Sequence, residues 1–415
     1  MKRWVGWRKK LIFFALLPAV CIGLTTCGGG GSSSSSSSPP PPVSNSQPIE
    51  VDLGPANNYV NGLFTSVTVC APGTSNCQTI PDVLVDTGSE GLRLLSSAVT
   101  LSLPAETDGN SNDLQECMSF ADGSYLWGPV ATADVQLAGE KASSVPIQIV
   151  SANPSYAVPS QCTSGGGSNE NTVASLGANG ILGIGNFRHD CGTACTSSST
   201  APALYYLCPN SVCGAVTVGL TAQVQNPVWL FSRDNNGVLI SLPSVSATGA
   251  PTVAGTLIFG IGTQSDNALG SAVIYTTDSS GNFQATYNGI AYSNSYIDSG
   301  SNALYFLDHN TLGIPDCSDN PGWYCPSSTV SYTVTNTGLN GATGPVSFNI
   351  ANADSLFSSN GGNNAAFNDL GGDSGTSTSS DYFDFGIPFF YGRNVFVGIN
   401  GQPGPNGSVG PYWAY

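Results

Sequence analysis

The chain has 415 residues, of which 40% are hydrophobic, enough to build two domains with packed cores. Charged residues make up only 9%, while Gly (51) and Pro (27) are abundant, which favours short strands joined by turns over long amphipathic helices. The formal net charge of −16 leaves no basic surface to neutralise phosphates, which excludes nucleic-acid binding.

The first 26 residues are predicted to be a secretory signal. Five of the ten basic residues lie in the first ten positions, and the apolar run Leu11–Val20 follows, too short to span a membrane as a helix. The segment Leu24–Cys27 resembles a lipoprotein processing site, which predicts lipidation of Cys27, with ordinary export as the alternative. Residues 27–48 are rich in Gly, Ser and Pro and are predicted to be a tether to the cell envelope, at the outer membrane or cell surface.

Ten further cysteines, an even number in an exported chain, predict disulfides. The short-range pairs Cys70–Cys77 and Cys317–Cys325 are expected, and Cys117–Cys162 closes a longer loop. The pairing of four others stays open, and zinc binding by them is the alternative: Cys191, Cys195, Cys208 and Cys213. The two histidines, His189 and His309, have no neighbouring ligand pattern, so no metal or cofactor is predicted.

An internal repeat divides the rest of the chain. The segment VLVDTGS (Val83–Ser89) recurs as SYIDSGS (Ser295–Ser301), each at the end of a strand-like stretch. Each copy is followed downstream by an apolar segment with glycine, at Gly180–Gly185 and Phe383–Phe389. The bare motif also occurs at Asp373, but there it is expected to lie in a polar loop, residues 371–381, with no strand before it.

The repeat places one acid in each half, Asp86 and Asp298. Two carboxyl groups held about 3 Å apart cannot both ionise, so one is a proton donor while the other is a base. Such a pair can deprotonate water and protonate a carbonyl oxygen without a metal. Gly88 and Gly300 allow tight turns at the two acids, and Ser89 and Ser301 are placed to hydrogen-bond the outer carboxylate oxygens.

These motifs resemble those of the pepsin-like aspartic peptidases, over nearly the whole chain after the tether. The resemblance implies an all-β, two-lobed acid-protease fold with few short helices, with lobes at 49–226 and 227–415. It also implies that the hydroxyls of Thr87 and Ser299 lock the two loops together. Short helices are expected near Tyr205–Leu207 and Leu307–Leu312.

The resemblance further implies a flap hairpin over the substrate, with Phe120, Asp122, Gly123 and Tyr125 as flap residues. Phe120 stands where the family usually has Tyr, and Tyr125 or Trp127 is the proposed substitute. Arg93 stands at a position usually held by Trp, and Ile387 replaces an Asp common in the closing segment. The residues from Pro388 to Val397 resemble the closing strands of the family.

The sequence therefore predicts a monomeric aspartic endopeptidase that cleaves extended polypeptides. Residues 28–92 contain no Lys or Arg, so no basic pro-segment is expected and no activating cleavage is needed. The alternatives are a catalytically impaired pepsin-like binding or inhibitory module and an unrelated all-β envelope or adhesion protein.

Overall fold

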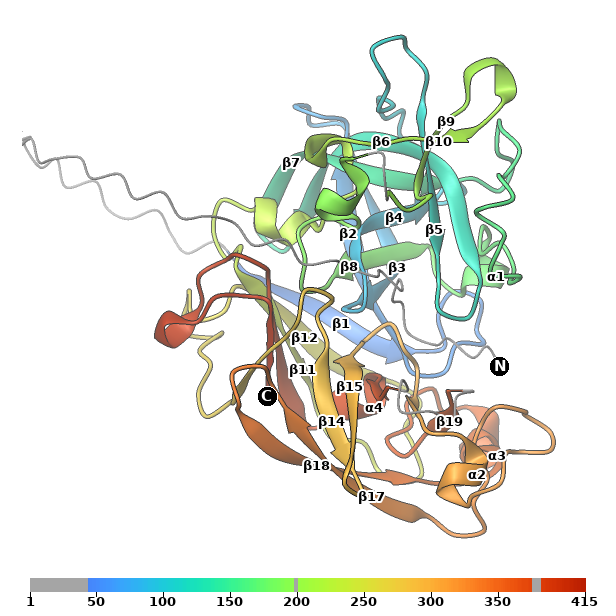
Figure 1. Cartoon of the computed structure of the whole chain (residues 1–415), viewed down its shortest axis with the longest axis vertical. Helices are drawn as coiled ribbons and strands as arrows, with labels where there is room; N and C mark the ends of the chain where they lie inside the picture. The colour runs from blue at the N-terminus through green and yellow to red at the C-terminus, as the bar shows by residue number, and fades with distance from the viewer. Residues whose placement is uncertain (1–43, 198–200, 375–381) are drawn as a thin grey trace, which may run out of the picture.

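The computed structural model describes residues 44–197, 201–374 and 382–415. The expected signal, the lipidation site Cys27 and most of the tether lie outside these residues. The two halves of the chain form two lobes, one coloured blue to green and the other yellow to red, with β1 (Ser46–Asp52) running between them (Figure 1). Helices are short, as predicted: α1 (Val173–Leu176), α2 (His309–Leu312), α3 (Ala353–Ser358) and α4 (Ile387–Phe390).

The larger sheet has fifteen strands and extends through both lobes. Its order is β10 (Gly214–Ala215), β9 (Tyr205–Leu207), β5 (Leu114–Ser119), β6 (Tyr125–Leu137), β7 (Glu140–Val150), β4 (Glu90–Leu95), β8 (Gly180–Ile184), β3 (Cys77–Asp86), β2 (Gly62–Cys70), β1, β12 (Val253–Phe259), β11 (Gly237–Leu242), β21 (Arg393–Gly398), β22 (Tyr412–Ala414) and β13 (Ile274–Thr276). Because β6 also pairs with β2, the first-lobe part of this sheet folds back on itself.

Strand β1 joins the lobes. One edge pairs with β2 of the first half, and the other pairs with β12 of the second half from Ser46 to Val51. Ile49 and Val51 are buried in a core cluster that contains residues of both halves. The strand begins at Ser46, so the tether predicted to run to Pro48 ends at least three residues earlier.

The smaller sheet has seven strands and belongs to the second half. Its order is β18 (Thr343–Ile350), β17 (Val330–Thr337), β14 (Phe283–Tyr287), β15 (Ile290–Ile297), β20 (Asp384–Phe385), β16 (Leu304–Phe306) and β19 (Gly371–Asp373). Its core is aromatic: the ring of Phe306 lies 5.4 Å from those of Tyr332 and Phe383. Stacked and edge-on rings of this kind add packing energy beyond their buried area.

The sequence repeat is also a structural repeat. In the first half, β8 runs parallel to β3 and antiparallel to β4. In the second half, β20 runs parallel to β15 and antiparallel to β16. Leu84 pairs with Ile181 in the first arrangement, and Tyr296 pairs with Asp384 at the matching position of the second. Asp86 ends β3, and Asp298 follows the last residue of β15.

Three local predictions were wrong. Tyr205–Leu207 is strand β9 and not a helix, because it pairs with β5 and β10 and buries both tyrosines. Gly371–Asp373, predicted as a polar loop, is strand β19, parallel to β16. The first residues of the expected closing strand, Pro388–Phe390, belong to α4, with Pro388 in its first turn, where it needs no N–H partner.

All ten cysteines of the described residues form disulfides. The three expected pairs are present, and the four open cysteines pair as Cys191–Cys195 and Cys208–Cys213. Their sulfurs are therefore bonded to each other and not available to zinc. Among the described residues, no helix has the length and apolarity that a membrane span requires.

Candidate active site

Asp86 and Asp298, 212 positions apart in sequence, lie together where the two lobes meet, and both are fully buried. We call them the carboxyl pair. Each packs against the glycine of the opposite loop: a methyl group added at Gly300 would lie 2.6 Å from Asp86 Oδ1, and one added at Gly88 would overlap the Asp298 carboxylate. Only glycine leaves this space, because any Cβ would push the two acids apart.

The two loops exchange hydrogen bonds symmetrically. Thr87 N donates to Ser299 Oγ at 3.1 Å, and Ser299 N donates to Thr87 Oγ1 at 2.9 Å. The hydroxyls then donate to buried carbonyls, Ser299 to Val85 O at 2.8 Å and Thr87 to Ile297 O at 3.5 Å. The structure thus has Thr87 and Ser299 joining the loops, in the arrangement that the resemblance implied.

Each acid is also held by its own loop. The N–H groups of Gly88 and Gly300 donate to Asp86 Oδ1 and Asp298 Oδ1, both at 2.7 Å. Ser89 Oγ lies 2.5 Å from Asp86 Oδ2, whereas Ser301 Oγ lies 3.2 Å from Asp298 Oδ2. The Oδ1 atoms of the two acids therefore accept equivalent hydrogen bonds, whereas the Oδ2 atoms lie at different distances from the two serine hydroxyls.

The electrostatics of the pair follow from this geometry. Burial raises the pKa of Asp86 well above its ordinary value, and the nearby charge of Asp298 and a hydrogen bond between the two carboxyl groups raise it further. The hydrogen bonds from Ser89 and Gly88 act in the opposite direction. Because the groups titrate as a pair, they retain one shared proton at a pH where an isolated aspartate is ionised.

The apolar segments with glycine lie directly against the loops. Asp298 N donates to Phe385 O at 3.0 Å, and Ile387 N donates to Ser301 O at 2.8 Å. A methyl group at Gly183 would lie 2.7 Å from the backbone of Glu90, and one at Gly386 would overlap Ala303 O. These glycines permit the close approach of backbone to backbone that fixes the acids.

The predicted flap is the hairpin between β5 and β6. Phe120 N donates to Ser124 O at 2.8 Å, and Asp122 Oδ1 accepts from Ser124 N at 2.9 Å and Ser124 Oγ at 2.6 Å. Gly123 has a φ of +84°, a conformation that favours glycine. Asp122 and Gly123 therefore shape the turn.

The aromatic residues of the hairpin face different clusters. Phe120 is buried in the cluster that contains Tyr59 and Leu84. Tyr125 and Trp127 belong to another cluster, built around the Cys117–Cys162 disulfide. Phe120 therefore packs apart from Tyr125 and Trp127, and the substitution of either for a flap tyrosine stays a prediction.

Sequence reasoning missed two residues near the pair. Tyr59 is buried, and its pKa is raised by burial and also by the charges of Tyr305, Asp86, Asp298 and the flap residue Asp122. No sequence pattern marks it, because it lies outside both motifs. Asp384 was treated only as part of a packing segment, although an acid within an apolar run was a usable signal.

Arg93 connects the loop strand to the flap. Its Nη2 contacts Glu116 Oε1 at 2.7 Å and Asp190 Oδ2 at 3.0 Å, with all three side chains fully or nearly fully buried. Tyr205 donates to Asp190 Oδ1 at 2.7 Å. Burial raises the pKa of Glu116 to about 8, the nearby charge of Arg93 lowers it, and Asp190 raises it. Since Arg93 lies on β4 and Glu116 on β5, this network connects the two strands.

His309 has acidic neighbours that its sequence context did not indicate. Its Nδ1 lies 3.3 Å from Asp373 Oδ2 and 3.4 Å from Asp316 Oδ2. The ring is partly exposed, and the ligand atoms of the three side chains all lie within 4.8 Å of one another, a grouping that the sequence did not predict. His189 packs against Trp229, with ring centroids 5.7 Å apart.

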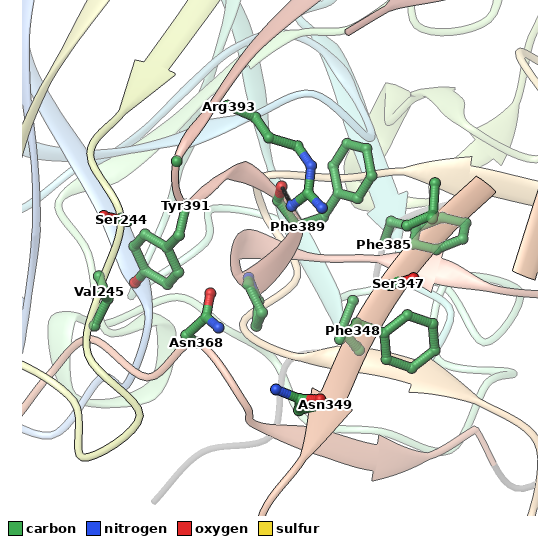
Figure 2. A pocket seen from close by; sticks show the side chains of 14 residues that line it. Ser244, Val245, Ser347, Phe348, Asn349, Asn368, Phe385, Phe389, Tyr391 and Arg393 are labelled. Carbon is green, nitrogen blue, oxygen red and sulfur yellow. Dashed lines mark hydrogen bonds between the residues drawn. The ribbon is translucent and has the colours of Figure 1, made fainter. Parts of the chain in front are cut away.

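A cavity of about 400 Å³ lies in the second lobe (Figure 2). Phe348, Phe385, Phe389 and Arg393 line it, together with polar side chains such as Asn368. The guanidinium of Arg393 lies over the Phe389 ring, 4.7 Å from its centroid, and donates to Phe389 O at 2.6 Å. Neither acid of the carboxyl pair lines this cavity.

Comparison with solved structures defines the class of fold. The chain is similar to the aspartic proteinase from Irpex lacteus, with a TM-score of 0.52 and 14% sequence identity, over 89% of this chain and 96% of that one. The fold is therefore the all-β, two-lobed, pepsin-like fold that the sequence predicted.

Residues 41–415 match the family model described as "Protein of unknown function (DUF3443)", and the chain belongs to that family. No curated protein matches the sequence.

Proposed function

We propose that the protein is an aspartic endopeptidase in which Asp86 and Asp298 are the catalytic residues. The observation that carries the proposal is the position of two buried carboxyl groups, each packed against the glycine of the opposite loop. A pepsin-like fold supports the proposal but does not by itself define a function.

In the proposed reaction, one carboxyl group of the pair is ionised and accepts a proton from water, while the protonated group donates to the carbonyl oxygen of the scissile peptide. The supporting residues Thr87, Gly88, Ser89, Ser299, Gly300 and Ser301 hold the acids in place. The substrate is an extended polypeptide under the flap hairpin. Phe120 contributes apolar contact and no hydrogen bond, so it favours apolar substrate side chains.

We further propose that the protein acts as a monomer at the cell envelope, held by a lipid on Cys27. The five disulfides support export to an oxidising compartment. Cells expressing the full chain and fed radiolabelled palmitate are expected to label the wild type and not Cys27→Ser. Equal labelling of both would assign the lipid elsewhere, and no labelling would favour ordinary export.

A pepsin-like binding module is the second candidate. It is favoured by the complete burial of both carboxyl groups, which water and substrate must reach, and by the absence of a hydroxyl on Phe120. Such a module would retain unfolded polypeptide without cleaving it.

The two candidates are separated by one assay. The full chain in detergent is incubated with an unfolded protein from pH 3 to 7, with and without pepstatin. Cleavage is expected in acid, and Asp86→Asn or Asp298→Asn is expected to reduce kcat at least about 10³-fold, because neither variant can share a proton between two carboxyl groups. Asp354→Asn, an acid of α3 bonded to Asn320, is the control. A folded wild type that binds the polypeptide but leaves it intact would favour the binding module.

A further inference from the structure

A third acid, Asp384, lies beside the carboxyl pair. Its neighbours Phe383 and Phe385 both belong to the aromatic core, where their rings stack with centroids 5.9 Å apart. Because side chains alternate along a strand, Asp384 points to the opposite face, toward the Asp298 loop. It is only 1% exposed.

One hydroxyl links Asp384 to the pair. Ser301 Oγ lies 2.6 Å from Asp384 Oδ2 and 3.2 Å from Asp298 Oδ2. A serine hydroxyl has one proton to donate and two lone pairs to accept with. When Asp384 is ionised, the shorter contact takes that proton, and Ser301 then presents a lone pair to Asp298. A lone pair favours the protonated form of the carboxyl group that it faces.

The first half of the molecule provides an internal comparison. There Ser89 Oγ donates to Asp86 Oδ2 at 2.5 Å. The position that matches Asp384 is held by Ile181, which is fully buried and has no acceptor to offer. The two serines therefore occupy equivalent places, but only the hydroxyl of Ser301 has a second carboxylate that competes for its proton.

We propose that Asp384 is a positioning residue which, through the hydroxyl of Ser301, opposes the loss of the shared proton from the carboxyl pair. This inference rests on the proposed function and adds a third acid that sets the pH at which the pair works. The ionisable groups on the elements around Asp384 are Asp298 and Tyr296 beside β15, Tyr305 on β16, and Asp86 across the pair. The tyrosines remain neutral in acid, so the three carboxyl groups determine the titration.

The test measures the pH at which the pair releases its shared proton. The full chain, labelled with ¹³C at the aspartate carboxyl carbons, is titrated by NMR, and the signals are assigned from the Asp86→Asn and Asp298→Asn spectra. In Asp384→Asn, loss of the third negative charge is expected to lower this pH by roughly one unit. The acid and alkaline limits of kcat/KM are expected to move in the same direction.

Removal of either serine hydroxyl tests the direction in which the pH of proton release changes. Ser301→Ala removes an acceptor for the proton of Asp298 and is expected to lower the release pH. Ser89→Ala removes a donor to ionised Asp86 and is expected to raise it. Asp354→Asn removes a charge elsewhere in the second lobe and is expected to leave it unchanged.

An unchanged titration in Asp384→Asn, or a rise in both serine variants, would overturn the inference. The NMR signals do not depend on turnover, so the two proposals fail separately. A protein that cleaves peptides but keeps its titration in Asp384→Asn refutes only the role of Asp384. A protein with the expected shifts and no cleavage at any pH refutes only the peptidase.

Discussion

Thr87 and Ser299 each provide a hydroxyl that accepts from the backbone of the other loop and donates to a buried carbonyl. A buried donor or acceptor without a partner costs about 1–3 kcal/mol, whereas an intact hydrogen bond contributes about 1 kcal/mol. The same two residues therefore contribute to stability and to the placement of the acids.

Replacing Ser299 with Ala removes partners from both Thr87 N and Val85 O. We expect the variant to lose about 2–4 kcal/mol in free energy of unfolding, measured by urea denaturation. Ser331→Ala is the control, since that hydroxyl bonds Asn349 on an exposed surface of β17; its change is expected within about 0.5 kcal/mol. Equal losses in the two variants would contradict the buried role of Ser299.

At this scale the sequence identified the residues whose role lies within a repeated motif. Asp86 and Asp298 were found because two copies of one pattern each follow an apolar strand. The contacts of Tyr59 and Asp384 depend on distant segments meeting in space, as Ser301 meets Asp384, 83 residues away. No local pattern encodes such a meeting.

Among the elements, β4 and β5 are joined by a buried ion pair as well as by their neighbouring strands. Arg93 on β4 forms ion pairs with both Glu116 and Asp190. Its removal would leave buried carboxyl groups without a compensating charge, which is far more costly than loss of an exposed pair.

Arg93→Met is expected to cost about 3–5 kcal/mol at pH 9, above the pKa of about 8 of Glu116, where this buried carboxyl group is ionised. The cost is expected to be smaller at pH 5, where Glu116 holds its proton. Urea denaturation at both pH values measures this, with Arg233→Met, at an exposed position, as the control. A loss of the same size at both pH values would show that the packing of Arg93, and not its charge, stabilises the flap strand.

The elements most accurately predicted from sequence were the strands that lead into the two copies of the repeat, β3 and β15. Strand β9 was predicted as a helix because three residues, Tyr205–Leu207, carry no periodicity. Its conformation is set by the backbone groups of β5 and β10 that it satisfies.

In the whole molecule, the buried acids determine how stability depends on pH. The pKa of Glu116 is about 8 in the folded protein against 4.5 for the free group, so between these values unfolding releases a proton. Stability therefore falls as pH rises from about 4.5 to 8, and Asp86, with its raised pKa, acts in the same direction. Burial acts to raise the pKa of Asp134, but its hydrogen bonds, including one from Lys141, outweigh burial and lower the pKa. The contribution of Asp134 to stability is therefore lost as pH falls below 3.8.

We therefore expect the melting temperature to be highest near pH 4–5 and to decline toward pH 8. A series of thermal melts from pH 3 to 9 measures this, and Glu116→Gln is expected to flatten the decline, because its side chain does not titrate. A melting temperature that rises steadily from pH 4.5 to 8 would contradict the expectation.

The two-lobed fold was predictable because the repeat and the strand composition agreed. The continuous fifteen-stranded sheet could not be predicted from the sequence. It depends on the register of β1 with β12, from Ser46 opposite Ile258 to Val51 opposite Val253, and pairing between strands about 200 residues apart leaves no local signature.

The disulfides have a mechanical consequence. Four of them close loops in the first half and one closes a loop in the second, so no covalent cross-link joins the two halves among the described residues. Contact between the two halves therefore depends on noncovalent interactions, such as the pairing of β1 with β12 and the core cluster that both halves share. Any movement of one half relative to the other would disturb these contacts and break no sulfur bond.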